Sequence, residues 1–258
     1  MSLTDVQSQK DYRNININKV GVKGVKYPIT LLDKKNGLQH TIADINMYVL
    51  LPSKFKGTHM SRFIEVINEN KNEINIKKIH HILAQTKAKL NAKKAYLEIN
   101  FEYFVEKQAP VSKIKSLMSY SCGLHAFSGD VDELTLFVKV PVTSLCPCSK
   151  EISDYGAHNQ RAFVSVYVKF SDMVWIEDVI NIVEANSSSD IYCLLKRPDE
   201  KYVTEKAYNN PMFVEDIARN VVKALKSDKR IYWYKVEVES LETVSYTHLR
   251  AHETGRNL

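Results

Sequence analysis

PVTSLCPCSKEISDYGAHNQR, residues 141–161, is the most informative stretch of this chain. An apolar run at residues 134–140 leads into it, and a second apolar run at residues 162–170 follows it. Such runs are typical of β-strands, so the stretch is predicted to be a loop between two strands. The loop carries four side chains that can bind a divalent cation: Cys146, Cys148, Glu151 and His158.

The chemistry of this loop leaves two interpretations open. Thiolate and imidazole are ligands that zinc and other borderline cations prefer, and a loop between rigid strands can hold them in place. A protein-bound metal ion usually has three or four convergent ligands, more than a C-x-C pair and one histidine guarantee. The thiols could equally be small buried side chains, with the histidine serving only to close the loop.

Composition limits the classes of protein to which this chain can belong. The 258 residues are 44% hydrophobic and 26% charged, which is typical of a soluble globular protein. No apolar run approaches the ~18 residues of a membrane-spanning helix, and the polar N-terminus does not resemble a signal peptide, so we expect a cytoplasmic protein. Four cysteines do not suggest a disulfide framework. The net charge of +6 is scattered, so we expect no nucleic-acid partner, whereas a nucleoside triphosphate needs only a few placed cations.

Hydrophobic periodicity predicts an α+β fold of two tandem ββααββ units, antiparallel sheets with helices on one face. In the first half, strands and helices are expected at residues 15–32, 38–51, 60–67, 76–90, 94–105 and 111–127. In the second half they are expected at residues 134–140, 162–170, 176–183, 210–225 and 231–238, with no evident last strand. Asn210 is read as the N-cap of the last helix and Pro211 as its first residue. The predicted divisions are a mobile tail at 1–14, units at 15–130 and 131–244, and a disordered or non-native tail at 245–258.

Two long segments carry a family resemblance. TSLCPCSKEISDYGAHNQR at residues 143–161 and LKRPDEKYVTEKAYNNPMFVED at residues 195–216 resemble the type IB GTP cyclohydrolase I family, as does KGTHMSRF at residues 56–63. The resemblance implies a tunnelling fold and hydrolysis of GTP to 7,8-dihydroneopterin triphosphate and formate, which feeds folate-type pterin synthesis. It also implies a divalent metal ion (Zn, Mn or Fe) and a homo-oligomer, with a homotetramer expected, whose sites lie at subunit interfaces.

The resemblance assigns roles to particular residues. It implies that Cys146, His158 and Glu200 are metal ligands, and that Glu215 anchors the purine edge by accepting hydrogen bonds from adjacent N–H groups of guanine. From the sequence alone, Glu200 is one charge in a solvated loop, and Glu215 is a carboxylate favoured by a helix N-terminus. The catalytic residues expected are therefore Cys146, His158 and Glu215.

The sequence does not single out the residues that bind the triphosphate. Four cations are candidates for the triphosphate, although each could equally be a surface charge: Arg161, Lys196, Arg197 and Lys201. No glycine-rich phosphate loop is present, so GTP is expected to be bound as a substrate by its base and by side-chain cations, not as in a kinase or a switch GTPase.

The C-terminal segment departs from the family. Ser245 falls where the family has a histidine, and SYTHLRAHETGRNL resembles no ending of the family, which puts a further metal-site residue and the last strand in doubt. Two alternatives to the main interpretation stay open. One is a tunnelling-fold enzyme that acts on another purine or pterin with Cys146 as nucleophile, and the other is a non-catalytic purine-binding relative.

Overall fold

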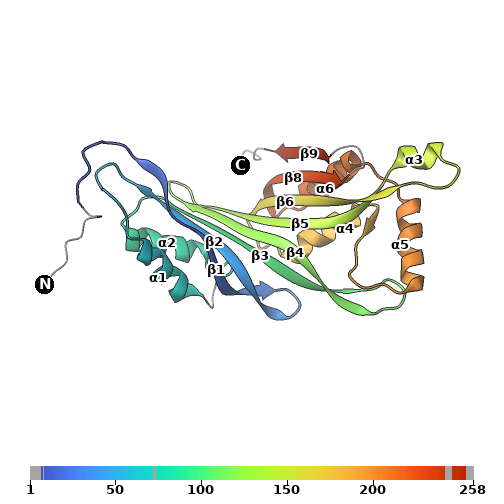
Figure 1. Cartoon of the computed structure of the whole chain (residues 1–258), viewed down its shortest axis with the longest axis horizontal. Coiled ribbons are helices and arrows are strands. Elements are labelled where there is room, and N and C mark those ends of the chain that lie inside the picture. Colours follow the sequence, from blue (N-terminus) through green and yellow to red (C-terminus); the bar gives the residue numbers. More distant parts are fainter. Residues whose placement is uncertain (1–6, 8, 72–73, 242–245, 254–258) are drawn as a thin grey trace. The chain divides into compact units, whose positions relative to one another are not determined.

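The structure is a computed structural model that describes residues 7, 9–71, 74–241 and 246–253 (Figure 1). The chain divides into two compact units, Met1–Glu102 with Gly123–Thr135 and Tyr103–Cys122 with Leu136–Leu258. In chain order the elements are β1 (Ile17–Asp33), β2 (Gly37–Leu51), α1 (Met60–Asn70), α2 (Ile79–Leu90), β3 (Ala95–Gln108), β4 (Lys115–Ser128), β5 (Glu133–Leu145), α3 (Pro147–Ile152), β6 (Asn159–Phe170), α4 (Ile176–Ala185), β7 (Ser189–Asp190), α5 (Arg197–Asn209), α6 (Val214–Ser227), β8 (Ile231–Leu241) and β9 (Tyr246–Glu253).

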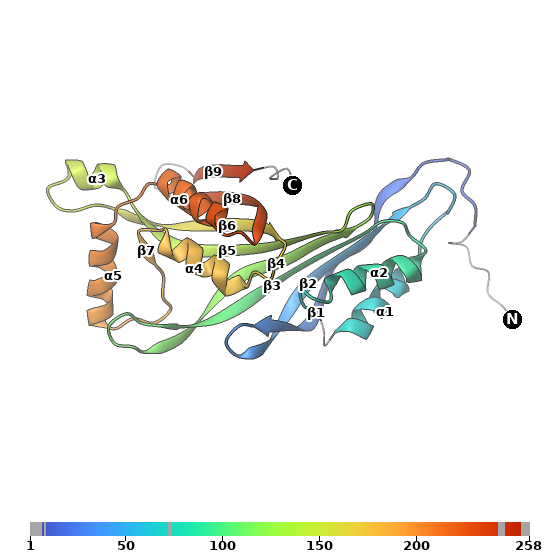
Figure 2. The same cartoon turned by 180° about the vertical axis from the view of Figure 1, so that it is seen from behind.

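In the first unit, β1 and β2, the two strands that the sequence predicts at residues 15–32 and 38–51, form an antiparallel hairpin, and β2 pairs in turn with β3. The turn is made by residues 33–37, where Asp33 accepts a hydrogen bond from the backbone N–H of Lys35 at 2.8 Å and Gly37 has a φ of 83°. A residue with a side chain rarely adopts that φ, which is why glycine ends the turn. Helices α1 and α2 cover one face of this sheet with their buried apolar residues (Figure 2).

In the second unit, antiparallel pairing runs from β5 to β6, from β6 to β8 and from β8 to β9. Alternate residues of β5 and β6 are fully buried, because successive side chains of a strand point to opposite faces of the sheet. Helices α4 and α6 cover this buried face with stripes such as Ile217, Val221 and Leu225 (Figure 2). The predicted strand–strand–helix–helix–strand–strand order is therefore confirmed twice, with α3, β7 and α5 inserted in the second repeat.

The predicted start of α6 was wrong. Asn210 is the C-cap of α5, not the N-cap of the next helix, and α6 starts at Val214 with Phe213 as its N-cap. The intervening backbone is held by β5 instead, since the N–H of Met212 donates to the carbonyl of Leu145 at 3.1 Å. The N-terminal end of α6 is satisfied by the side chain of Asp216, which accepts from the N–H of Phe213 at 3.2 Å.

Two further elements differ from the prediction. Helix α5 occupies the segment that was read as a solvated loop, and it is hard to recognise because only Asp199 and Ala207 of its residues are buried. Strand β9 is present as backbone at Tyr246–Glu253 and pairs with β8, so that the second unit does have a last strand. Ser245, at the position of the family histidine, lies outside the described residues.

Membrane-spanning segments can be assessed from the helices. Within residues 7, 9–71, 74–241 and 246–253, every helix is too short or too polar to cross a bilayer.

Candidate functional site

The pairing of β5 with β6 brings Cys146 and His158 together. The last pair of the ladder is Leu145 with Asn159, so the next residue of each strand faces the other across the strand ends. Their backbones are in contact, because the N–H of Cys146 donates to the carbonyl of His158 at 3.2 Å. Two residues separated by twelve positions in the loop thus become neighbours through strand register.

The thiol of Cys146 is also the N-cap of the short helix α3. Its Sγ accepts a hydrogen bond from the N–H of Ser149 at 3.5 Å. The hydroxyl of Ser149 donates to the carbonyl of Cys146 at 3.0 Å and accepts from the N–H of His158 at 3.2 Å. These bonds close the loop around the cysteine, whereas Cys148 and Glu151 on the same helix are exposed.

Glu215 reaches the same place from a distant part of the chain. The segment before α6 is fixed to the end of β5 by the bond between Met212 and Leu145, and by the hydroxyl of Ser144, which donates to the carbonyl of Met212 at 2.9 Å. Glu215, in the first turn of α6, is half-buried. One pocket of about 250 Å³ is lined by residues of all three segments: Ser144, Cys146, His158, Gln160, Phe213, Val214 and Glu215.

A second pocket adjoins this one. It has a volume of about 340 Å³ and shares Gln160 with the first, and its lining includes Arg161 and the inner side of α5. Of the four predicted phosphate-binding cations, Arg161 is the one that lines this cavity. It lies next to Gln160 on β6, on the opposite face of the strand.

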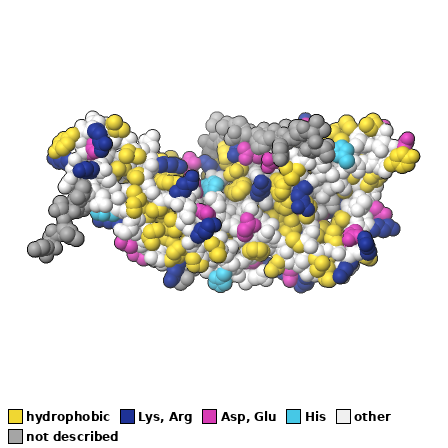
Figure 3. Space-filling view, viewed as in Figure 1, with side chains coloured by type: hydrophobic (Ala, Val, Ile, Leu, Met, Phe, Trp, Pro, Cys, Tyr) yellow, Lys and Arg dark blue, Asp and Glu magenta, His cyan; other side chains and the backbone are white. Residues whose placement is uncertain are grey.

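The structure does not bring the other predicted residues into the first pocket. Glu200 lies in the first turn of α5, where its carboxylate is 2.9 Å from the guanidinium of Arg197, and both side chains are exposed. Lys201 lies 3.8 Å from Glu205 on the same helix, and Lys196 is exposed as the N-cap. On the face shown in Figure 3, lysine and arginine side chains lie scattered among acidic and hydrophobic ones.

A metal ion fits part of this donor set. A thiol and an imidazole in one pocket are suitable ligands for zinc, and for iron or manganese if an oxygen ligand joins them. Within the described residues, no group of three or more His, Cys, Asp or Glu side chains is placed to hold a metal ion. Cys146 and His158 can therefore supply two ligands, and the remaining ligands would have to come from outside this arrangement, for example from water or from a rearranged Glu200.

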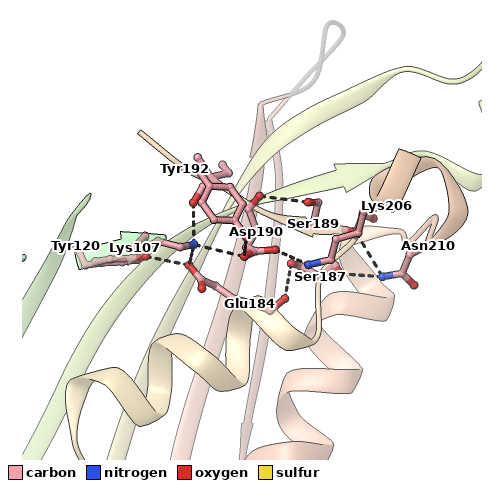
Figure 4. Close-up of polar contacts among 11 residues, drawn as sticks. Lys107, Tyr120, Glu184, Ser187, Ser189, Asp190, Tyr192, Lys206 and Asn210 are labelled. Atoms are coloured by element: carbon pink, nitrogen blue, oxygen red, sulfur yellow. Dashed lines mark hydrogen bonds and ion pairs between the residues drawn. The ribbon is translucent and has the colours of Figure 1, made fainter. Parts of the chain in front are cut away.

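The second unit holds a buried ionic cluster that was not predicted from the sequence (Figure 4). The ammonium of Lys107, on β3, lies 2.7 Å from Glu184 and 3.6 Å from Asp190, and all three side chains are nearly inaccessible to solvent. Lys206 of α5 binds the other oxygen of Asp190 at 2.5 Å, and Tyr120 and Tyr192 donate to Glu184 and Asp190. No local pattern marks these residues, because partners such as Lys107 and Glu184 lie 77 positions apart.

Burial and charge act on the pKa values of this cluster in opposite directions. Burial raises the pKa of Glu184 in spite of the neighbouring Lys107. Burial also acts to raise the pKa of Asp190, but hydrogen bonds from Lys206 and Tyr192 and the charge of Lys107 bring it below its usual range. Burial, together with the charge of Glu184, raises the pKa of Tyr120. The cluster is thus a set of mutually satisfied ions and not a group of free acids and bases.

Asp199 is a second buried carboxylate that the sequence did not reveal. It is fully buried and accepts bonds from the backbone N–H groups of Val111, Ser112 and Lys196 at 2.8–2.9 Å, and from the hydroxyl of Ser112 at 2.6 Å. Burial opposes ionisation, but these bonds hold the pKa of Asp199 well below its usual range. The carboxylate fastens the start of α5 to the β3–β4 turn.

Urate oxidases are among the solved structures that share this fold. Uricase from Arthrobacter globiformis matches with a TM-score of 0.51 and 8% sequence identity, and covers 93% of this chain and 94% of its own. Urate oxidase from Bacillus sp. TB-90 matches with a TM-score of 0.54 and 8% identity, covering 92% and 100%. At this identity the likeness shows the fold alone, which is the tunnelling fold.

Sequence relatives are much closer. GTP cyclohydrolase FolE2 of Citrifermentans bemidjiense is 55% identical over 243 residues, covering 94% of this chain and 91% of its own length. Those of Syntrophus aciditrophicus and Thermosipho africanus are 55% and 54% identical and also cover 94% of this chain, with 95% and 94% of their own lengths. The family model described as "Type I GTP cyclohydrolase folE2" matches residues 3–248. This chain belongs to the type I GTP cyclohydrolase FolE2 family.

Proposed function

We propose that this chain hydrolyses GTP to 7,8-dihydroneopterin triphosphate and formate, as the name of its family indicates. In this reaction, water opens the imidazole ring of guanine, C8 leaves as formate, and the remaining atoms recyclise to the pterin. The observation that carries the proposal is the first pocket, where a thiol, an imidazole and a half-buried carboxylate from three separate segments meet. Such a convergence has no evident structural purpose and is typical of a catalytic site.

Glu215 is the residue proposed to bind the base. A carboxylate offers two acceptor oxygens side by side, which match the N1–H and the exocyclic amine of guanine. It lies in the first turn of α6, at the partly positive N-terminal end of the helix. Binding the base here would hold the purine against Cys146 and His158, and such positioning is itself a large part of catalysis.

Cys146 and His158 are proposed to hold a divalent metal ion, with zinc, manganese or iron as candidates. When bound, such an ion supplies an activated water and stabilises negative charge that develops during hydrolysis. Glu200 stays a predicted third ligand, and to reach the pocket it would have to exchange its ion pair with Arg197. The protein side chains supply the binding, orientation and shielding of the reacting ring.

The remaining expectations belong to the same proposal. Arg161, which lines the adjoining pocket, and the exposed Lys196, Arg197 and Lys201 are candidates for the triphosphate. A homotetramer with sites completed at subunit interfaces and a cytoplasmic location are also proposed, and the product would supply folate-type pterin synthesis.

One observation keeps open the alternative in which Cys146 is a nucleophile. Cys146 is partly accessible and lines the first pocket, as a nucleophile must. The two roles can be separated by measuring the metal content of the purified protein and of the Cys146→Ala variant by mass spectrometry. A ligand role predicts that the variant loses the metal ion, and a nucleophile role predicts that it retains it.

Formate release from GTP tests the function directly. The protein, supplied with Mn²⁺ or Zn²⁺, should release one formate for each GTP consumed, and Glu215→Gln should lower kcat/KM by about 10- to 100-fold because a hydrogen bond to a charged group is lost. Glu205→Gln is the matched control, since Glu205 is an exposed glutamate of α5 with Lys201 as its partner. Tight GTP binding without formate would instead indicate the non-catalytic relative.

A further inference from the structure

Three consecutive serines follow α4 in the second unit, and all of them are buried. Ser187, Ser188 and Ser189 have exposed fractions of 2%, 0% and 1%. They lie just beyond the helix that the sequence predicts at residues 176–183. Buried hydroxyl and backbone groups need hydrogen-bond partners, so a fully buried serine run implies that other segments are bound to it.

One partner of this serine turn is the end of β5. The N–H of Ser188 donates to the carbonyl of Thr143 at 3.1 Å, and its hydroxyl accepts from the N–H of Leu145 at 3.1 Å. The next residue, Ser189, pairs with Thr143 in the β5–β7 ladder. The turn therefore fixes the backbone of the residue that directly precedes Cys146.

The other partner is Asn210, at the end of α5 (Figure 4). Its side-chain amide donates to the carbonyls of Ser187 at 2.9 Å and Ser188 at 3.5 Å. Two residues later, Met212 is bound to Leu145 and Ser144, as described above. The segment that carries Glu215 is thus fastened on one side to the serine turn and on the other to β5.

We propose that Asn210 is a positioning residue, which sets the place of Glu215 relative to Cys146 by tying residues 210–213 to the serine turn. The inference rests on the proposed function, in which Glu215 receives the guanine base. Asn210 does not line the pocket and acts through the backbone. An amide suits this role because it brings two N–H donors to successive carbonyls, whereas aspartate would set acceptor against acceptor.

The test uses GTP and inosine triphosphate, which lacks the exocyclic amine that Glu215 is proposed to bind. The wild-type protein should prefer GTP by about 10- to 100-fold in kcat/KM, the value of one hydrogen bond to a charged group. Asn210→Ala and the near-isosteric Asn210→Asp should each lower this preference by about tenfold. The ratio for two substrates of one preparation does not depend on how much of the protein is folded.

Asn186→Ala is the matched control. Asn186 ends α4 as Asn210 ends α5, and its amide also donates to a backbone carbonyl, that of Ile182 at 2.8 Å. A similar loss of thermal stability is expected for Asn186→Ala, but the preference for GTP should be unchanged. An equal fall of the preference in this control would overturn the positioning role.

Glu215→Gln separates the role of Asn210 from that of Glu215. If this variant loses the preference for GTP while Asn210→Ala and Asn210→Asp keep it, only the role of Asn210 is wrong. If Glu215→Gln itself keeps the preference, the proposed anchoring of the base is wrong and the inference falls with it. If both roles are correct, Asn210 acts only through Glu215. The double variant Asn210→Ala/Glu215→Gln should then prefer GTP no less than Glu215→Gln alone does.

Discussion

The first pocket and the buried ionic cluster are two polar regions of the same unit with opposite characters. In the pocket, Cys146, His158 and Glu215 line a cavity, and the backbones of Cys146 and His158 are hydrogen-bonded to each other. In the cluster, Lys107 and Asp190 are almost inaccessible to solvent, and their charged groups contact one another directly (Figure 4). Both regions are built from residues far apart in the sequence.

The difference shows how the chain divides its polar groups between function and structure. A charged group that is buried without a ligand must be paired, because its desolvation is costly. A group that binds a substrate must keep part of its hydrogen-bonding capacity for that substrate, and so it lies where water can replace the ligand. Substitutions in the two regions test this division.

The largest effect on stability is expected in the cluster. Lys107→Met removes the cation that Glu184 and Asp190 share, and leaves buried carboxylates without it. The free energy of unfolding should fall by about 3–5 kcal/mol, as is typical when one partner of a buried ion pair is removed. Urea denaturation followed by circular dichroism measures it.

Lys115→Met is the control for that variant. Lys115 lies 3.1 Å from Glu106 at the exposed surface, with 60% of its side chain accessible. Its removal should change the free energy of unfolding by less than about 0.5 kcal/mol. Equal losses in the two variants would mean that burial does not distinguish the cluster from a surface pair.

Substitutions in the first pocket should lower activity much more than stability. Cys146→Ala is expected to lower kcat for formate release by about 100-fold or more, because even an outer partner of a metal site typically contributes 10- to 100-fold. The thermal midpoint of the metal-free protein should change little, since the thiol is only half-buried and makes one long hydrogen bond. A large loss of stability with retained activity would mean that Cys146 stabilises the fold and takes no part in the reaction.

Asp199 provides a prediction for pH. Its folded pKa is lowered, so the stability that it contributes is fully present above the unfolded value of about 4 and is lost as pH falls below it. The thermal midpoint of Asp199→Asn should lie below that of the wild type at pH 7, and the gap should narrow between pH 5 and pH 3.

Asp216→Asn is the matched control for that variant. Asp216 occupies the corresponding position of α6 and caps Phe213 by one bond of 3.2 Å, but it is half-exposed. The thermal midpoint should fall less than for Asp199→Asn, which removes a carboxylate that accepts four hydrogen bonds. A gap between wild type and Asp199→Asn that is constant from pH 7 to pH 3 would contradict the role given to ionised Asp199.

The smallest effect is expected for the exposed cations of α5. Lys201→Ala should leave the thermal midpoint unchanged and raise the KM for GTP by no more than about fivefold, since an exposed ion pair is worth ~1 kcal/mol or less. The increase should disappear at high salt, which screens exposed charges. Titrating NaCl in the formate assay measures this, and a salt-independent increase would point to a buried phosphate contact instead.

Much of the fold could be predicted from local pattern. Hydrophobic periodicity gave the two strands of the β1–β2 hairpin and the helices α1, α2 and α4. Helix α5 was missed because most of it is polar, and the start of α6 was misplaced because Asn210 and Pro211 are good helix-start residues in isolation. There, tertiary bonds to β5 and the serine turn override the local preference.

The candidate site was predicted in part. Residue type and family resemblance selected Cys146, His158 and Glu215, and the structure brings these three together. Glu200 is exposed beside Arg197, as the sequence alone suggested and the resemblance did not, and neither indicated that Asn210 would bind the serine turn. The sequence does not show whether an amide or a carboxylate side chain faces solvent or a buried hydrogen-bond partner.

The periodicity of the strands and helices and the chemical content of the 141–161 loop can be read from the chain alone, because both depend on residues close together in it. Which charges are paired and which are left to bind a ligand depends on the folded arrangement. Lys107 and Glu184 are 77 positions apart, and their contact depends on how strands and helices pack after the intervening chain has folded. Such long-range pairing is set by the burial of the whole core, which no local pattern records.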